Sequence, residues 1–381
     1  MWLKIKNAWL AKGDDASDFF IGGYLSGVFE RNQSVWEDYI AQIRDSSLSG
    51  KLPFLVSRSG MTANIAELLY ESARTNIFDS SLFGIFIYGG AVKNIPAITI
   101  LKILELMLLK GNKQNVHNAL EIIGSLIHNK YMPEITDTNL CYEILSHSVF
   151  FTKSDDKSIG SMVEYNWKEV AVSLAKQNIE KGINLLNLCI ANLGEDGTIV
   201  DSYKSDAWEF LDYVTQQSPD KVWPLIAQHL DPLKANGFTI VQWLSEGFTS
   251  KNEEHEYPTF NSLPRKAIFN WIEEKPKTRA ITMAHFAPFS FSKYGETPKS
   301  FTREIIENYG SSIEIRHAIS ANYHTGSWWG SASDHFGEKL KQLEQFKACE
   351  KDVKVLRWIN EEIENLKDAI KNSKIREERE D

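Results

Sequence analysis

Apolar residues recur along most of this chain at intervals of three and four, which place them on one face of an α-helix. Alternation of apolar and polar positions, which is typical of half-buried strands, is almost absent. The pattern therefore predicts an all-α protein. Three apolar stripes carry this prediction: Ile98, Leu101, Leu104 and Leu108; Val116, Leu120, Ile123 and Ile127; and Val222, Leu225, Ile226 and Leu230.

Between residues 182 and 350, five short polar breaks each separate two amphipathic segments. They lie at Gly182, Pro219, Pro276, Gly310 and Glu350, at intervals of 37, 57, 34 and 40 residues. Intervals of this size are typical of repeats built from helical hairpins. Because one hairpin cannot bury its apolar face alone, such hairpins stack on one another. We therefore expect an α-solenoid of HEAT-like or TPR-like helical hairpins.

Local signals predict several helix ends and contacts. Thr62 precedes the amphipathic segment 63–74, so we expect it to be an N-cap. Ser218 and Pro219 stand in the order expected for an N-cap and a first helical turn. Gly23 and Gly27 lie four residues apart, which predicts a close approach by another helix. The final helix is expected to cap the stack through one apolar face: Val353, Leu356, Ile363, Leu366 and Ile370.

Two regions with a soft boundary are expected. Residues 1–150 form an N-terminal helical region, and residues 161–381 form a helical-repeat region that ends in a C-terminal capping helix. The polar segment 151–160 between them is either a linker or a long loop within one continuous solenoid. The long interval after Pro219 indicates an insertion at 249–264 or an extra helix at 237–248.

Composition narrows the class of partner. The net charge is −9, from 42 basic and 51 acidic residues, and the sequence shows no basic stripe, so a nucleic-acid partner is not expected. The most apolar segment, 95–109, contains Lys102 and Glu105 and is too short to span a membrane. The eleven tryptophans are expected to fill gaps between stacked helices.

The start of the chain and its thiols indicate a cellular compartment. The first residues lack an apolar segment followed by a cleavage site, so we expect a cytoplasmic protein. Cys141, Cys189 and Cys349 are odd in number and far apart, and reduced thiols are the simplest account of them.

No catalytic motif stands out in this sequence. It lacks a P-loop, an HExxH or CxxC pattern and a GxSxG motif, so no catalytic residue, cofactor or metal site is predicted. One cluster keeps an alternative open. His317, His324 and His335, with Asp334, would be the residues of an enzyme or enzyme subunit whose site lies in a solenoid groove.

The most distinctive segment is 323–336, in which Trp328 and Trp329 stand between glycines. Adjacent residues of a helix cannot both face one core, so one indole ring is a candidate for exposure. Exposed aromatic residues in a loop that a scaffold holds often mark recognition. We therefore predict a partner-binding site at Trp328, Trp329, His324 and His335. The alternative is that both rings fill the space beneath the terminal helix pair.

From this loop to its end, the chain resembles the C-terminal part of large bacterial helical-repeat proteins. These include the sensor regions of STAND-type NTPases in antiviral defence. The resemblance rests on the Trp-Gly-Ser loop, on the helix start at Val355, Leu356, Arg357 and Trp358, and on the mixed-charge tail. It implies a ligand-sensing solenoid whose effector and NTPase parts lie elsewhere.

The leading hypothesis is a non-catalytic protein-binding scaffold or sensor in the bacterial cytoplasm, with antiphage defence as its setting. Its partner is expected to be a protein, and the sequence does not indicate an oligomeric state. Two alternatives stay open: the enzyme or enzyme subunit with its site near His317, and a HEAT-like protein that binds nucleic acid through a basic inner surface.

Overall fold

The computed structural model describes residues 1–12, 18–88, 91–130, 137–152, 161–195, 198–200, 206–231, 237–246, 258–325 and 330–380. Within these residues the regular secondary structure is helical throughout, with no strand. The predicted all-α class is therefore confirmed. The chain divides into two compact units, Met1–Val214 and Thr215–Asp381.

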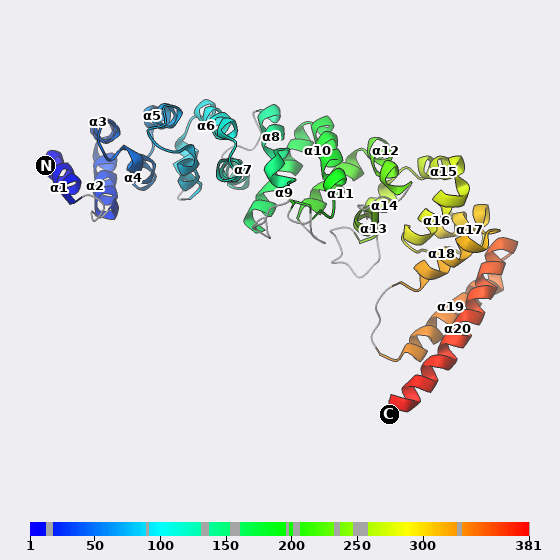
Figure 1. Cartoon of the computed structure of the whole chain (residues 1–381). Coiled ribbons are helices and arrows are strands. Elements are labelled where there is room, and N and C mark those ends of the chain that lie inside the picture. Colours follow the sequence, from blue (N-terminus) through cyan, green and yellow to red (C-terminus); the bar gives the residue numbers. More distant parts are fainter. Residues whose placement is uncertain are drawn as a thin grey trace. The chain divides into compact units, whose positions relative to one another are not determined.

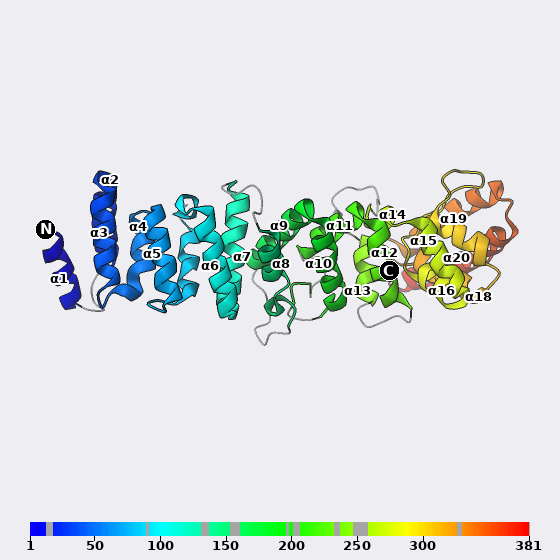
Figure 2. The same cartoon turned by 90° about the horizontal axis from the view of Figure 1, so that it is seen from above.

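In the first unit, short helices follow one another in chain order, coloured blue to green in Figures 1 and 2. The last helix of the series continues into the second unit. The helices are α1 (Trp2–Lys12), α2 (Asp18–Arg31), α3 (Gln33–Arg44), η2 (Ser49–Lys51), α4 (Leu52–Ser59), α5 (Ala63–Arg74), η3 (Ser80–Ile87), η4 (Ala91–Asn94), α6 (Ala97–Lys110), α7 (Lys113–His128), α8 (Thr138–Leu145), η5 (Ser148–Phe150), α9 (Ser161–Gln177), α10 (Ile179–Asn192) and α11 (Ala207–Gln217).

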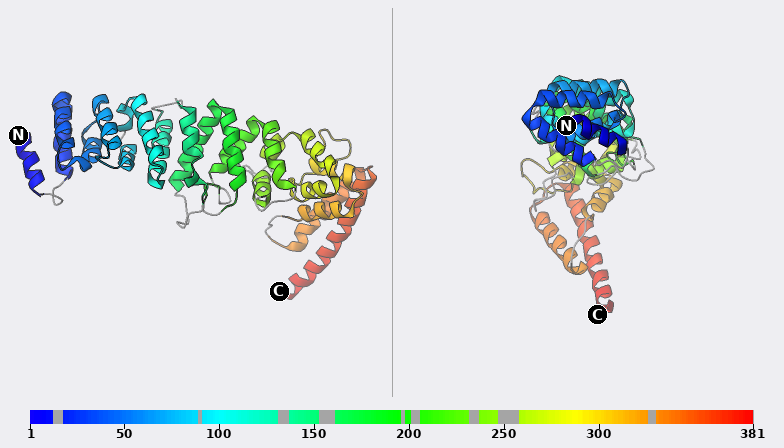
Figure 3. Two further views of the ribbon diagram at one scale, coloured as in Figure 1. Left: turned by 45° about the horizontal axis from the view of Figure 1, so that its top comes forward. Right: turned by 90° about the vertical axis from the view of Figure 1, so that its left-hand side faces the viewer.

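The second unit ends in a long helical hairpin, α19 and α20, which extends away from the shorter helices α15 to α18 (Figure 3). The helix α13 corresponds to the extra helix that the sequence offered at 237–248. The helices are α12 (Pro219–Leu230), α13 (Gly237–Glu246), α14 (Pro258–Ser262), α15 (Arg265–Glu274), α16 (Pro276–Phe286), α17 (Phe301–Tyr309), α18 (Ile313–Tyr323), α19 (Ala332–Cys349) and α20 (Val353–Glu380).

Four of the five predicted breaks lie at the ends of helices. Pro219 and Pro276 occupy the first turns of α12 and α16, where a missing backbone N–H leaves no intrahelical bond unmade. Gly310 and Glu350 are the C-cap residues of α17 and α19. The polar breaks in the sequence therefore separate consecutive helices, as expected for helical hairpins.

The fifth break lies slightly earlier than its glycine. Asn178 caps α10 by accepting a hydrogen bond from the backbone of Lys181, and Gly182 lies inside that helix. A Cβ atom at Gly182 would lie 2.8 Å from the Cβ of Ala175 on α9. This glycine therefore serves close packing of α10 on α9, whereas the break itself depends on the asparagine cap.

Polar contacts join helices that lie about one hairpin apart in the sequence. Their separations of 35 to 48 residues match the length of one helical-hairpin repeat. These five separations are those that consecutive helical hairpins would give. The pairs are Glu67–Lys102, Lys168–Glu209, Asp231–Arg279, Arg303–Glu350 and Arg316–Glu361.

Several tryptophans fill the spaces between helices, as the sequence led us to expect. Trp36 is fully buried, stands edge-on to Phe29 and donates to Ser59 Oγ at 2.9 Å. Trp167 is also buried and donates to the Leu145 carbonyl oxygen at 3.1 Å. Because the indole N–H groups of these two tryptophans have acceptors, both rings are buried without leaving that donor unpaired.

The predicted close approach at Gly23 and Gly27 is wrong. A Cβ atom at either position would have no atom within 4 Å among its described surroundings. Gly22 instead faces the neighbouring helix, and a Cβ there would lie 3.2 Å from Arg58 Cβ on α4. Gly23 and Gly27 share one face of α2, as their spacing predicts, but α4 packs against the face that contains Gly22.

Two predicted apolar stripes coincide only in part with the buried faces. Ile98 is 65% exposed, because α6 buries the face that contains Ile100, Ile103 and Met107. Val353 is 80% exposed as the first residue of α20, whereas two other residues of the same predicted stripe, Ile363 and Leu366, are buried. Both segments carry apolar residues on more than one side, so periodicity alone did not determine which side packs.

The two units meet within α11, beyond the soft boundary expected at 151–160. Helices on the two sides of that segment pack together, since α9 contacts both α7 and α8. The indole N–H of Trp167 also bonds to the backbone of α8. Most of the segment, 153–160, lies outside the described residues.

Candidate partner-binding site at the C-terminal helical hairpin

A three-residue turn joins α19 to α20. The Glu350 carboxylate accepts hydrogen bonds from the backbone N–H groups of Lys351 and Asp352, at 2.9 and 2.8 Å. The Asp352 carboxylate then accepts from the backbone of Lys354 and Val355, at 2.9 and 3.0 Å. The turn therefore places acceptors at the N-terminus of α20, where free N–H groups need them.

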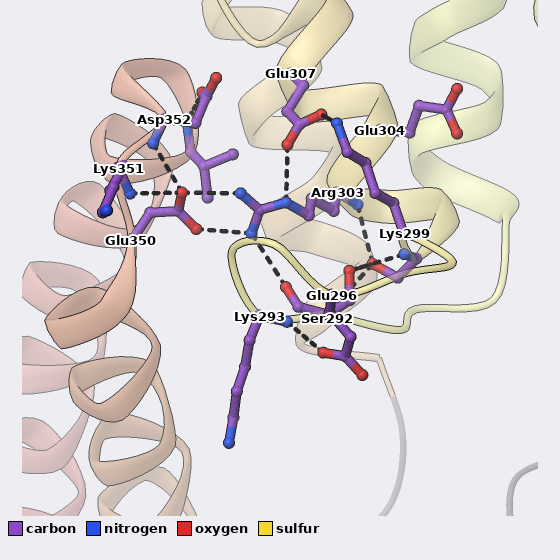
Figure 4. Close-up of polar contacts among 12 residues, drawn as sticks. Ser292, Lys293, Glu296, Lys299, Arg303, Glu304, Glu307, Glu350, Lys351 and Asp352 are labelled. Carbon is purple, nitrogen blue, oxygen red and sulfur yellow. Dashed lines mark hydrogen bonds and ion pairs between the residues drawn. The ribbon is translucent and has the colours of Figure 1, made fainter.

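A buried ion pair fixes this turn to α17 (Figure 4). The Arg303 guanidinium donates to both oxygens of Glu350, at 2.7 and 2.8 Å, and both side chains are 1% exposed. Arg303 also donates to Glu307 at 2.8 Å and to the Ser292 carbonyl oxygen at 3.1 Å. Burial acts to raise the pKa of Glu350, but Arg303 and the turn N–H groups hold it below its usual value.

Further contacts attach the hairpin to the carboxyl ends of α17 and α18. Lys354 donates to the Glu307 carbonyl oxygen at 2.7 Å, and Lys339 donates to the Tyr323 carbonyl oxygen at 2.7 Å. Unpaired carbonyl groups give a helix C-terminus a partial negative charge, which a lysine complements. Arg316 adds a bidentate pair with Glu361, at 2.7 and 3.0 Å.

His324, which directly follows α18, makes another contact with α20. Its Nε2 lies 2.5 Å from Glu362 Oε1 on α20. Glu362 is fully buried, and its burial opposes ionisation, yet the hydrogen bond with His324 holds the pKa of this carboxyl below its usual value. One ring of this region, Trp358, is buried beside Tyr323 and donates to Ser320 at 3.1 Å. The base of the hairpin is therefore held by both charge and aromatic packing.

A carboxylate from near the end of α20 caps the N-terminus of α19. Glu377 accepts from the Ser333 backbone and hydroxyl, at 3.0 and 2.7 Å, and from the Ser331 hydroxyl at 3.0 Å. These hydrogen bonds lower the pKa of Glu377. Residues on both sides of 326–329 are consequently attached to α20, His324 to Glu362 and the two serines to Glu377.

The structure describes two of the four predicted partner-binding residues, His324 and His335. Trp328 and Trp329 lie outside the described residues, so their role stays a prediction. His324 and His335 lie near one another, because the His324 ring stands edge-on to Phe336, beside His335 on α19. Burial lowers the pKa of His335. His324 holds α18 to α20 through Glu362, a role that the sequence did not suggest.

The four residues of the enzyme alternative do not form one cluster at the base of the hairpin. His317 lies on the exposed side of α18, and Asp334 is exposed in the first turn of α19. In the described part of the chain, no three histidine, cysteine, aspartate or glutamate side chains are grouped so that they could hold a metal ion. The pair that does form, His324 with Glu362, joins two helices.

Sequence reasoning missed the charged residues that fix the hairpin, although the sequence contains a signal for some of them. Glu362 falls on the same helical stripe as Trp358, Ile359 and Ile363, which are all buried. A carboxylate on an apolar stripe needs a buried partner. This position therefore predicts an ion pair or hydrogen bond, but it does not identify His324 as the partner.

A scan of protein-family models and searches of curated proteins and solved structures found no match to this chain. The resemblance to sensor regions of STAND-type proteins accordingly stays a prediction. Among the described helices, none is both long and apolar enough to cross a membrane.

Proposed function

We propose that this protein is a non-catalytic helical-repeat scaffold or sensor that binds a partner protein at its C-terminal hairpin. This proposal rests on a contrast within the hairpin: its base is fixed to α17, whereas α19 buries few of its residues. The base is fixed by the buried Arg303–Glu350 pair, whereas α19 buries only Ser333 and Leu343 among its 18 residues. The hairpin thus offers an extended face on a rigid support.

A rigid support favours recognition for a thermodynamic reason. Ordering a flexible segment on binding costs conformational entropy, and a surface that is already fixed avoids most of that cost. Trp328 and Trp329 stand between two attached residues, His324 and Ser331, and tryptophan is enriched among the residues that contribute most to binding. We propose these tryptophans as the anchors of the partner, in a setting of bacterial antiphage defence.

The surroundings of two of the three thiols and of His324 support a non-catalytic role for these groups. Cys141 and Cys189 are buried, and burial raises the pKa of the Cys141 thiol to about 12, so it stays protonated at neutral pH. Burial raises the pKa of Cys189 as well. The imidazole of His324 is already bonded to the Glu362 carboxylate, in a contact between two helices.

Affinity capture with the full chain tests this proposal. The wild type would be compared in lysates of the native host, with and without phage infection, with W328A/W329A. The control is Y88A, because Tyr88 is a strongly exposed aromatic residue (73%) that lies in the first unit, away from the hairpin in the sequence. We expect the double variant to lose a protein that the wild type and Y88A retain, with unchanged helical circular dichroism.

Equal capture by the double variant would refute the proposed anchors. A loss of helical signal in that variant would instead support the alternative that both rings pack beneath the terminal helices. Binding of a nucleic acid in the same lysates, detected as nuclease-sensitive retention, would favour the HEAT-like nucleic-acid alternative over a protein partner.

A further inference from the structure

An exposed arginine in the first unit lies in a corner between two aromatic rings. The Arg58 guanidinium carbon is 3.9 Å from the centre of the Phe19 ring and 4.6 Å from that of Phe54. The two rings meet edge to face, at 78° and with 6.1 Å between their centres. Gly22 on α2 leaves room for the stem of the arginine, since a Cβ there would lie 3.2 Å from Arg58 Cβ.

These contacts hold the cation in place without neutralising it. Among the described residues, Arg58 has neither a hydrogen bond nor an ion pair, and the carboxylate of Asp18, beside Phe19 in the sequence, is paired with Lys51 at 3.0 Å. Aromatic rings interact with the faces of a guanidinium and leave its N–H donors, which lie in its plane, able to bind an oxyanion. Because the two rings already hold the long arginine side chain, a ligand that binds it loses less affinity to the ordering of that side chain.

The surroundings of Arg58 indicate the chemistry of its ligand. Phe19 and Phe20 are 66% and 64% exposed, so apolar surface adjoins the cation along α2. A nucleic acid or an anionic membrane would require several basic residues together, whereas the chain has a net charge of −9 and the neighbouring Lys51 is already paired. A planar carboxylate matches the two parallel donors of a guanidinium.

We propose that the corner formed by Arg58, Phe19 and Phe54 binds a carboxylate side chain in an acidic segment of a partner protein, with an apolar neighbour of that carboxylate on Phe19 and Phe20. This site lies in the first unit and does not depend on the function proposed for the C-terminal hairpin.

A peptide array tests the proposal with the full chain. The probes are short peptides that combine glutamate with leucine or phenylalanine. Each is compared with two matched peptides, its glutamine twin and its phosphoserine twin, in which that residue replaces glutamate. The peptide that binds best would then be labelled and titrated by fluorescence anisotropy. We expect glutamate peptides to bind at least tenfold more tightly than their glutamine twins, because a charge-assisted bidentate contact is lost in the twin.

Substitutions assign the preference to Arg58. R58M keeps most of the side-chain stem and should remove the preference, and R58K should give an intermediate affinity because an ammonium cannot bind a carboxylate in the same bidentate way. The control is R74M, which removes one charge from the same unit. The Arg74 guanidinium is already occupied by Glu71, at 2.6 and 2.9 Å, so this change should alter the affinity less than twofold.

Three results would overturn the proposal: no preference for glutamate over glutamine, an equal effect of R58M and R74M, or tighter binding of the phosphoserine twin. R58K keeps the test valid if R58M fails to fold. W328A/W329A should bind the peptide as tightly as the wild type, so failure at the hairpin can be distinguished from failure at Arg58.

Discussion

Substitution of Arg303 by methionine should destabilise the attachment of the C-terminal hairpin more than any exposed charge change on the same helices. The substitution removes the guanidinium that binds both oxygens of Glu350 and leaves a carboxylate buried at 1% exposure. It also removes a donor from the Ser292 carbonyl oxygen, at 3.1 Å. Because the buried charge cannot reach water, the loss should exceed that of an ordinary hydrogen bond.

Removing one partner of a buried ion pair typically costs about 3–5 kcal/mol. E350Q should cost less, about 1–3 kcal/mol, because the amide oxygen can still accept from the turn backbone and Arg303 keeps Glu307 as a charged partner. Replacing both residues in R303M/E350L should recover much of the loss of R303M, since a buried pair and an apolar pair of similar volume are often nearly equal in stability.

Local hydrogen exchange measured by mass spectrometry is the appropriate assay, because a chain with two compact units need not unfold in one step. Peptides from 301–309 and 353–366 should lose protection on the order of a hundredfold in R303M, which corresponds to about 3 kcal/mol. The matched control is E364Q on α20, whose pair with Lys367 is exposed and should contribute little.

The pH dependence of E350Q follows from the lowered pKa of Glu350. Its ionised form is stabilised in the folded state, so this contribution is present above the unfolded value of about 4.5 and is lost as the pH falls through the lower folded value. The difference in protection between wild type and E350Q should therefore be largest near neutral pH and shrink in acid. A loss below tenfold in R303M, or an equal loss in E364Q, would refute the reasoning.

Two other predictions concern thiols and glycines. In the native protein, a thiol reagent should label Cys349 quickly, because it is the only exposed cysteine of the three. Cys141 and Cys189 should stay unlabelled until urea is added. Mass spectrometry of the labelled peptides checks this, and early labelling of either buried thiol would contradict it. G60A should lower the urea midpoint of the first unit, because Gly60 has a φ of +153° and a Cβ there would lie 2.5 Å from the Phe29 ring. G23A should instead raise the stability of this unit by about 0.5–1 kcal/mol, because Gly23 occupies an open helical position. Equal midpoints for these two glycine variants would contradict the packing described for α2 and α4.

Local residue chemistry made several helix ends predictable. Thr62 caps α5 by accepting from the Ile65 backbone, as its position before an amphipathic segment predicts. Ser218 and Pro219 take the expected N-cap and first helical positions of α12, although the Ser218 side chain makes no capping hydrogen bond. Capping involves residues within three or four positions of each other, so the sequence contains all the information that it requires.

The candidate site was predictable only in part, because its contacts join residues far apart in the chain. The sequence directed attention to His324, but its partner Glu362 lies 38 residues away on another helix. Arg303 and Glu350 are 47 residues apart, and either could have been an exposed charge at the end of a helix. Their burial depends on how α17 meets the turn between α19 and α20.

By itself, the sequence determined that this chain is built from short amphipathic helices and where several of them begin or end. Helical periodicity and caps act over a few residues, so they can be recognised before any packing is known. The tertiary structure decided which face of each helix is buried, that Gly22 rather than Gly23 meets α4, and which charges are paired. These outcomes depend on contacts between distant segments, whose geometry is set when the helices pack and cannot be inferred from the spacing of residues within one of them.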